Sequence, residues 1–160
     1  MSQPTQSLNI REFMTRHLLD VFETMVSEKA VPSDARGWSA QGEHVSGSVG
    51  FGGENVTGAV YLHLSTPFAT RIAASMLGLS AGEMAGETEV NDVVGEVTNM
   101  LTGGLKSALC DAGAPCAVST PTIIRGTSFV VEPIADVEQM LLGFQCGDER
   151  VMVEVHIRYS

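Results

Sequence analysis

The chain has 160 residues, 44% apolar and 18% charged, a balance typical of a globular domain and not of a disordered chain. Its formal net charge of −10 argues against nucleic acid and anionic membranes as partners, because both favour clustered Lys and Arg. No stretch approaches the ~20 apolar residues of a membrane span, and the N-terminus lacks a signal-peptide layout. We therefore expect one domain over residues 1–160, in the cytoplasm, with residues 1–8 disordered.

The first quarter of the chain predicts one amphipathic helix and a loop. Asn9, followed three residues later by Glu12, resembles a capping box that opens a helix over residues 10–29. Residues 32–43 are rich in Gly, Ser and charge and are predicted to form a loop, with Trp38 as its anchor.

Two strands and a second helix follow. Apolar residues alternate with polar or small ones over 44–51 and 55–64, and the Gly-rich residues 52–55 between them predict a hairpin. Thr66 is the expected N-cap of a helix over residues 67–77, because Pro67 suits a first helical position and Gly78 suits the position after the end.

Residues 89–112 predict one long helix, capped by Thr88 and ended by Gly113 and Pro115. One side carries the apolar residues expected to face a core: Val90, Val93, Val94, Val97, Leu101, Leu105 and Ala108.

The opposite side of this helix carries Asp92, Glu96, Asn99 and Gly103. Glu96 and Asn99 are helical neighbours, with Cβ atoms about 5–6 Å apart. Mid-helix glycine costs roughly 1 kcal/mol relative to alanine, so a merely solvated face would more cheaply carry Lys and Glu. Small residues beside a carboxylate and an amide would let another surface approach. From the residues alone, however, an exposed polar face remains the favoured interpretation.

The last third of the chain is predicted to be strands, over residues 116–119, 122–125 and 129–133, followed by a hairpin of 137–146 and 150–159. In the final strand Val151, Val153 and Val155 point toward the core, while Glu154 and His156 point to the solvated face. The order of elements predicts an α+β fold, in which long helices pack in two layers on a largely antiparallel sheet. The two halves loosely repeat a helix followed by a hairpin.

Other motifs carry little chemistry. Gly50 to Gly53 lacks the Lys-Ser/Thr of a phosphate loop, and His17, His44, His63 and His156 have no metal-ligand spacing. Neither a Gly-x-Ser-x-Gly elbow nor a cysteine in a basic setting is present, and the three cysteines are expected to be reduced and mostly buried. We expect no metal site and no cofactor held by the chain itself.

The segment Glu96-Val97-Thr98-Asn99 resembles the ExxN signature of the CheC/CheX/FliY family of chemotaxis phosphatases, which dephosphorylate the response regulator CheY. Met100, Gly103 and Lys106 resemble the CheX branch, and the resemblance extends from about residue 10 to 159. Two positions depart from the family pattern. Val26 stands where a second ExxN motif would have Asn, and Gly104 stands where CheX proteins commonly have Asn.

The resemblance implies a phosphatase acting on the aspartyl phosphate of a CheY-like receiver in chemotaxis signalling. Asn99 would position the attacking water, Glu96 would pair with a receiver Lys, and Asp92, Gly103 and Lys106 would contact the partner. Mg²⁺ would come from the receiver. A homodimer formed through the sheets is also expected. The alternative is a CheX-like module that binds a receiver or a flagellar switch component without hydrolysis.

Overall fold

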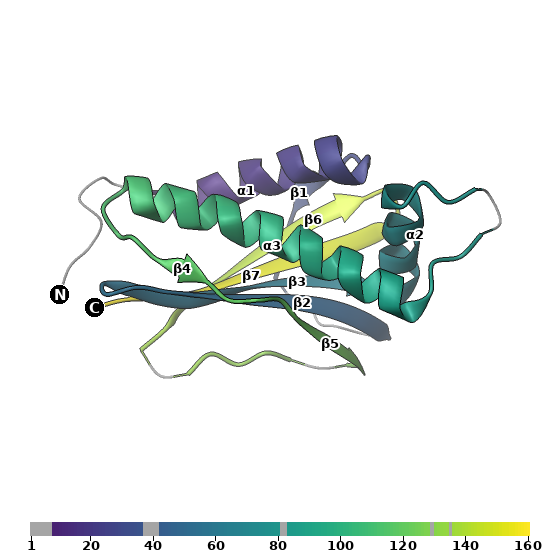
Figure 1. Cartoon of the computed structure of the whole chain (residues 1–160). Coiled ribbons are helices and arrows are strands. Elements are labelled where there is room, and N and C mark those ends of the chain that lie inside the picture. The colour runs from purple at the N-terminus through teal and green to yellow at the C-terminus, as the bar shows by residue number, and fades with distance from the viewer. Residues whose placement is uncertain (1–7, 37–41, 81–82, 129, 135) are drawn as a thin grey trace.

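Figure 1 shows the computed structural model, which describes residues 8–36, 42–80, 83–128, 130–134 and 136–160. The helices are α1 (Ile10–Val21), which runs into a π-helical turn, η1 (Phe22–Val26), then α2 (Thr66–Met76) and α3 (Glu87–Asp111). The strands are β1 (Val31–Ser33), β2 (Glu43–Gly52), β3 (Val56–Ser65), β4 (Ala117–Val118), β5 (Thr122–Thr127), β6 (Glu138–Cys146) and β7 (Glu149–Tyr159).

Within the described residues, the strands form one antiparallel sheet of seven strands in the order β1-β6-β7-β3-β2-β4, with β5 also paired to β2. All three helices lie on one face of this sheet, with α1 alongside α3 and α2 near one end of α3 (Figure 1). The predicted α+β fold of helices on a largely antiparallel sheet is confirmed.

Helix ends follow local chemistry. The Asn9 side chain accepts a hydrogen bond from the Glu12 amide at 3.0 Å, as predicted. The first regular helix ends at Val21, however, before the predicted residue 29, because the last turn is π-helical and Ser27 has a left-handed φ of 61°. The N-cap of α2 is Ser65 instead of Thr66, since the Ser65 hydroxyl accepts from the Phe68 amide.

The long helix starts two residues before the predicted position 89. Its N-cap is Gly86 and not Thr88, and the Gly86 amide donates to the Glu89 carboxylate at 2.8 Å. Gly113 ends it with a φ of 93°. The predicted apolar residues from Val90 to Leu105 are buried, but Ala108 is only half-buried and Leu109 is the buried residue in the last turns.

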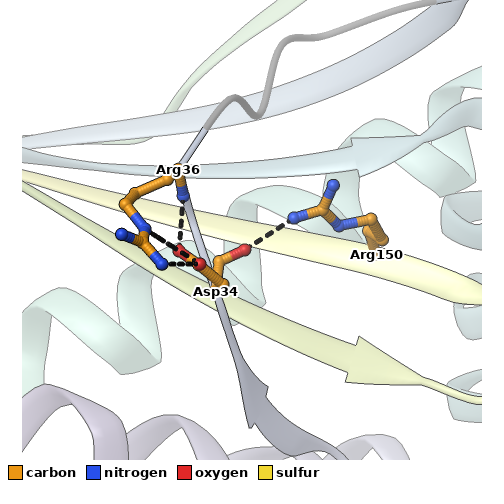
Figure 2. Close-up of polar contacts among 3 residues, drawn as sticks. All are labelled: Asp34, Arg36 and Arg150. Atoms are coloured by element: carbon orange, nitrogen blue, oxygen red, sulfur yellow. Dashed lines mark hydrogen bonds and ion pairs between the residues drawn. The ribbon is translucent and has the colours of Figure 1, made fainter.

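Strand β1 was not predicted, because two of its three residues, Pro32 and Ser33, lie within the stretch interpreted as a loop. It pairs with residues 143–145 of β6 at the edge of the sheet. Figure 2 shows how the chain leaves this edge: the Asp34 carbonyl accepts from Arg150 Nη2 at 2.7 Å, and the Asp34 carboxylate binds the Arg36 guanidinium. The predicted Trp38 anchor and the predicted disorder of residues 1–8 fall, except for Leu8, outside the described residues.

The second face of the sheet was predicted to be solvated, and this prediction is wrong at β7. Met152, Glu154 and His156 of β7 are 0%, 4% and 6% exposed. The chain between β5 and β6 crosses this face (Figure 1), and residues 132–134 and Val137 enclose a cavity of about 270 Å³ against Tyr61 and His156. This crossing segment was expected to include a strand over 129–133. Residues 130–133 are not a strand, and residue 129 lies outside the described range.

The polar side chains on this face are hydrogen-bonded to one another around the buried Glu154. Glu154 accepts from His63 Nε2 at 2.9 Å with one oxygen, and from Gln139 and His156 at 3.0 Å with the other. The other His63 ring nitrogen lies 2.6 Å from the Ser46 hydroxyl. Burial raises the pKa of the Glu154 carboxyl, but the hydrogen bonds from His63, Gln139 and His156 outweigh it and hold the pKa below its ordinary value of 4.5.

Candidate functional site on the long helix

The outer face of α3 presents the polar residues that the sequence placed there. Asp92 and Glu96 are exposed, while Asn99, Gly103 and Lys106 are half-buried. The helix has 25 residues, so at 1.5 Å per residue it is about 37 Å long. Glu96 and Asn99 lie one turn apart near its middle.

The side chains of Glu96 and Asn99 make no hydrogen bond or ion pair with any described residue. Asn91, on the same helix, behaves differently, because its Oδ1 accepts from Arg125 Nε of β5 at 3.0 Å. The Asn91 amide therefore holds the helix to the sheet, whereas the Asn99 amide has no such partner in the part of the chain that the structure describes. A carboxylate and an amide that bond to none of the described residues are available to a second molecule.

Below this face, α3 sits unusually close to the sheet. A Cβ on Gly47 of β2 would overlap the Thr98 hydroxyl, so glycine is needed at that position. The hydroxyls of Thr98 and Thr102 are fully buried and donate to the carbonyls of Val94 and Thr98. The two hydrogen bonds satisfy the buried hydroxyls within α3, while the close approach of Thr98 to Gly47 sets the helix against the sheet on the side away from Asn99. Neither feature was apparent from the sequence.

Gly103 and Gly104 are adjacent but differ in their surroundings. A Cβ on Gly103 would meet no atom within 4 Å, so this position opens outward. A Cβ on Gly104 would overlap the ring of His17 in α1. The outer face thus has a shallow gap at Gly103, one turn after Asn99.

The chemistry available on this face is limited. Among the described residues, no group of three or more His, Cys, Asp or Glu side chains could hold a metal ion. Cys146 of β6, away from this face, is a poor nucleophile, because burial raises the pKa of its thiol to about 11. A carboxylate and an amide without a nucleophile or metal can bind and orient groups of another molecule.

The family model described as "Chemotaxis phosphatase CheX" matches residues 45–145. The chain belongs to the CheX family. No curated protein matches it. The CheX-family match includes most of β2 and all of β3, α2 and α3, and therefore the whole candidate face.

Solved structures of CheX-related proteins share the fold. Chemotaxis protein CheX from Vibrio vulnificus is 26% identical with a TM-score of 0.80, over 94% of this chain and 97% of that one. A CheC-like chemotactic protein from Shewanella oneidensis is 26% identical with a TM-score of 0.75, over 94% and 100%. The CheX of a CheX–CheY–BeF3–Mg²⁺ complex from Borrelia burgdorferi is 19% identical with a TM-score of 0.76, over 95% and 99%.

The residues matched by the CheX family model include all of α3. No helix among the described residues is long and apolar enough to span a bilayer. The convergence of His63, Glu154 and His156 was missed from the sequence, because the three residues lie on two different strands. That network is buried on the opposite face of the sheet from α3, so it is not part of the candidate site.

Proposed function

We propose that this chain hydrolyses the aspartyl phosphate of a phosphorylated CheY-like receiver, and that α3 is the element it presents to the receiver. The observation that carries this proposal is the pair of side chains Glu96 and Asn99, which lie one turn apart on the outer face of α3 and bond to none of the described residues. The CheX–CheY complex of the Borrelia burgdorferi relative supports a CheY-like protein as the partner.

Asn99 positions the attacking water. Phosphoryl transfer depends mostly on positioning and electrostatics, and a carboxamide can accept one hydrogen bond from the water while donating another. Mg²⁺ belongs to the receiver, where it neutralises charge on the phosphoryl group, so the chain needs no cofactor of its own. The presence of Mg²⁺ in the complex of the relative is consistent with this division.

Glu96 pairs with a receiver Lys and sets the angle at which α3 enters the receiver site. Asp92 lies one turn earlier on the same exposed face, and Lys106 lies beyond the Gly103 gap. The three charged residues would therefore contact the receiver on both sides of Asn99.

Gly103→Ala separates stability from partner contact. We expect the variant to be more stable by up to about 1 kcal/mol, since the new methyl group meets no atom of this chain and alanine is the better helix former. We also expect weaker receiver binding, by roughly fivefold or more, because the methyl group fills the gap that the partner approaches. Thermal unfolding and titration with phosphorylated receiver measure the two effects. Unchanged affinity would remove Gly103 from the interface.

A CheX-like module that binds a receiver or a flagellar switch component without hydrolysis is the second candidate. The open polar face would serve such a binder equally well. The two functions differ in the fate of the phosphate. One enzyme molecule for every twenty receivers shortens the phosphate lifetime on all of the receivers, because each enzyme molecule acts repeatedly. A binder at the same ratio can affect at most one receiver per binder molecule. Measuring phosphate release at this ratio, beside a binding titration, distinguishes them.

We also propose a homodimer formed by pairing of sheet edges. Strand β1 is an edge strand of three residues that covers only residues 143–145 of β6, and edge backbone groups readily pair with another chain. Light scattering should then give twice the 16.9 kDa chain mass, about 34 kDa. A mass near that of one chain at micromolar concentration would refute the dimer.

A further inference from the structure

Gly104 and His17 fit together where α1 meets α3, close in the chain to the proposed water-positioning residue Asn99. His17 projects from α1 and is half-buried, and its ring stacks on Phe13 with centroids 5.6 Å apart. Its Nε2 lies 3.0 Å from the carbonyl oxygen of Met100, the residue after Asn99. The ring occupies the space that a Cβ on Gly104 would need.

The direction of this hydrogen bond follows from its acceptor. A carbonyl oxygen can only accept a hydrogen bond, so Nε2 of His17 carries a hydrogen and donates the hydrogen bond to the Met100 carbonyl. In α-helical geometry the same carbonyl also accepts from the amide of residue 104, four positions later. His17 is therefore a second donor to a carbonyl in the middle of α3, supplied by a different helix.

Consecutive glycines at 103 and 104 would otherwise leave α3 locally weak one turn after Asn99, since glycine is among the poorest helix formers. Only one of them has open space beside it. At Gly104 the missing side chain lets α1 approach, and the His17 hydrogen bond ties the backbone of the motif to α1 at that point. The contact thus compensates locally for the weakness that the glycines introduce.

We propose that His17 is a positioning residue: through the Met100 carbonyl it fixes the backbone at Asn99, and Gly104 is glycine in order to admit the His17 ring. This inference rests on the proposed function of Asn99. Side chains that orient a reacting group must be held within about half an ångström by their supports, and small displacements can cost up to about 100-fold in rate. His17 itself does not touch the receiver phosphate.

The test uses His17→Ala, Gly104→Ala and the double variant in the full chain. In Gly104→Ala the new methyl group displaces the imidazole ring and breaks its bond to Met100. Each single variant is expected to lower kcat for phosphate release by roughly 10- to 100-fold, with KM changed less than about threefold. The double variant should be no slower than His17→Ala, because both changes remove the same contact. His17→Gln retains an N–H donor and should recover most of kcat.

Thermal unfolding provides a readout that does not depend on activity. Gly104→Ala is expected to lower Tm when residue 17 is His, because the methyl group and the ring compete for one space. The same substitution is expected to raise Tm when residue 17 is Ala, because only the better helix propensity of alanine remains. Arg16→Ala is the matched control, since Arg16 is exposed and its ion pair is with Glu12. It should leave kcat and the Tm response unchanged.

The outcomes separate this inference from the proposed function. If the wild-type chain releases phosphate but His17→Ala keeps full kcat, or if the two single variants act additively, the positioning role is wrong while the phosphatase stands. If the wild-type chain releases no phosphate, the proposed function fails, and the sign of the Tm change still decides whether His17 and Gly104 are coupled. A Tm change of the same sign in both backgrounds would overturn the coupling.

Discussion

Asn99→Ala is expected to slow phosphate release from a Mg²⁺-loaded, phosphorylated receiver by about 100- to 1,000-fold, the usual cost of losing one positioned polar group in a reacting site. The effect should fall on kcat, because the amide orients water and contributes little to docking. Folding should be nearly unaffected, since the Asn99 side chain makes no hydrogen bond with the described residues. Single-turnover phosphate release at saturating chain measures the loss.

Two variants make this result specific to the amide. Asn99→Asp keeps the size but replaces the N–H donor with a second acceptor, so we expect it to be as slow as Asn99→Ala. Asn91→Ala removes another side-chain amide of the same helix, one that accepts a hydrogen bond from Arg125. We expect the rate of phosphate release by this variant to stay within about threefold of wild type despite some loss of stability. If Asn99→Ala releases phosphate at the wild-type rate, water positioning by this residue is excluded.

Glu154→Ala is expected to lower the free energy of unfolding by about 3 kcal/mol or more, a large part of the 5–15 kcal/mol typical of a domain. The substitution removes a buried carboxylate that accepts hydrogen bonds from the buried His63 and His156 and from the exposed Gln139. Urea unfolding measures the change. Glu138→Ala, at an exposed acid of β6, is the matched control and should cost less than about 0.5 kcal/mol.

The pH dependence of stability provides an independent check on Glu154. Because the folded-state pKa of this carboxyl lies below its ordinary value of 4.5, ionised Glu154 stabilises the fold above that pH. The contribution is lost as the pH falls below 4.5 through the folded-state pKa. Wild type should therefore lose stability more steeply over this range than Glu154→Gln, whose amide side chain does not bind a proton at these pH values. Parallel curves for the two proteins would show that the hydrogen bonds do not favour the ionised form.

Features with a strong local signal were predictable from the sequence. The period of Val90, Val94, Val97 and Leu101 identified the buried side of α3, and its opposite side is exposed at Glu96 as predicted. The hairpin strands were correct to within about a residue at most ends, because alternation and glycine turns mark them. The helix caps were less accurate, since several residues near each end can serve as a cap.

Features that depend on distant segments were not predictable. Alternation in β7 separates two faces, but it does not reveal that residues 132–134 and Val137 lie against the polar one beside His156, or that Glu154 is buried there. The close approach of α3 to Gly47, and of His17 to Gly104, likewise joins residues more than 45 positions apart. At the candidate site the sequence therefore predicted which residues lie on the outer face of α3, while the contacts that support this helix are visible only in the packing.

The lifetime of the aspartyl phosphate on a Mg²⁺-loaded cognate CheY is the measurement that tests the phosphatase proposal most directly. With the wild-type chain at one part in twenty, we expect the phosphate to be lost from all receivers, many for each chain, and with Asn99→Ala we expect almost no acceleration. If the wild-type chain binds the phosphorylated receiver but leaves the phosphate lifetime unchanged, the proposal is contradicted and the chain is a binding module.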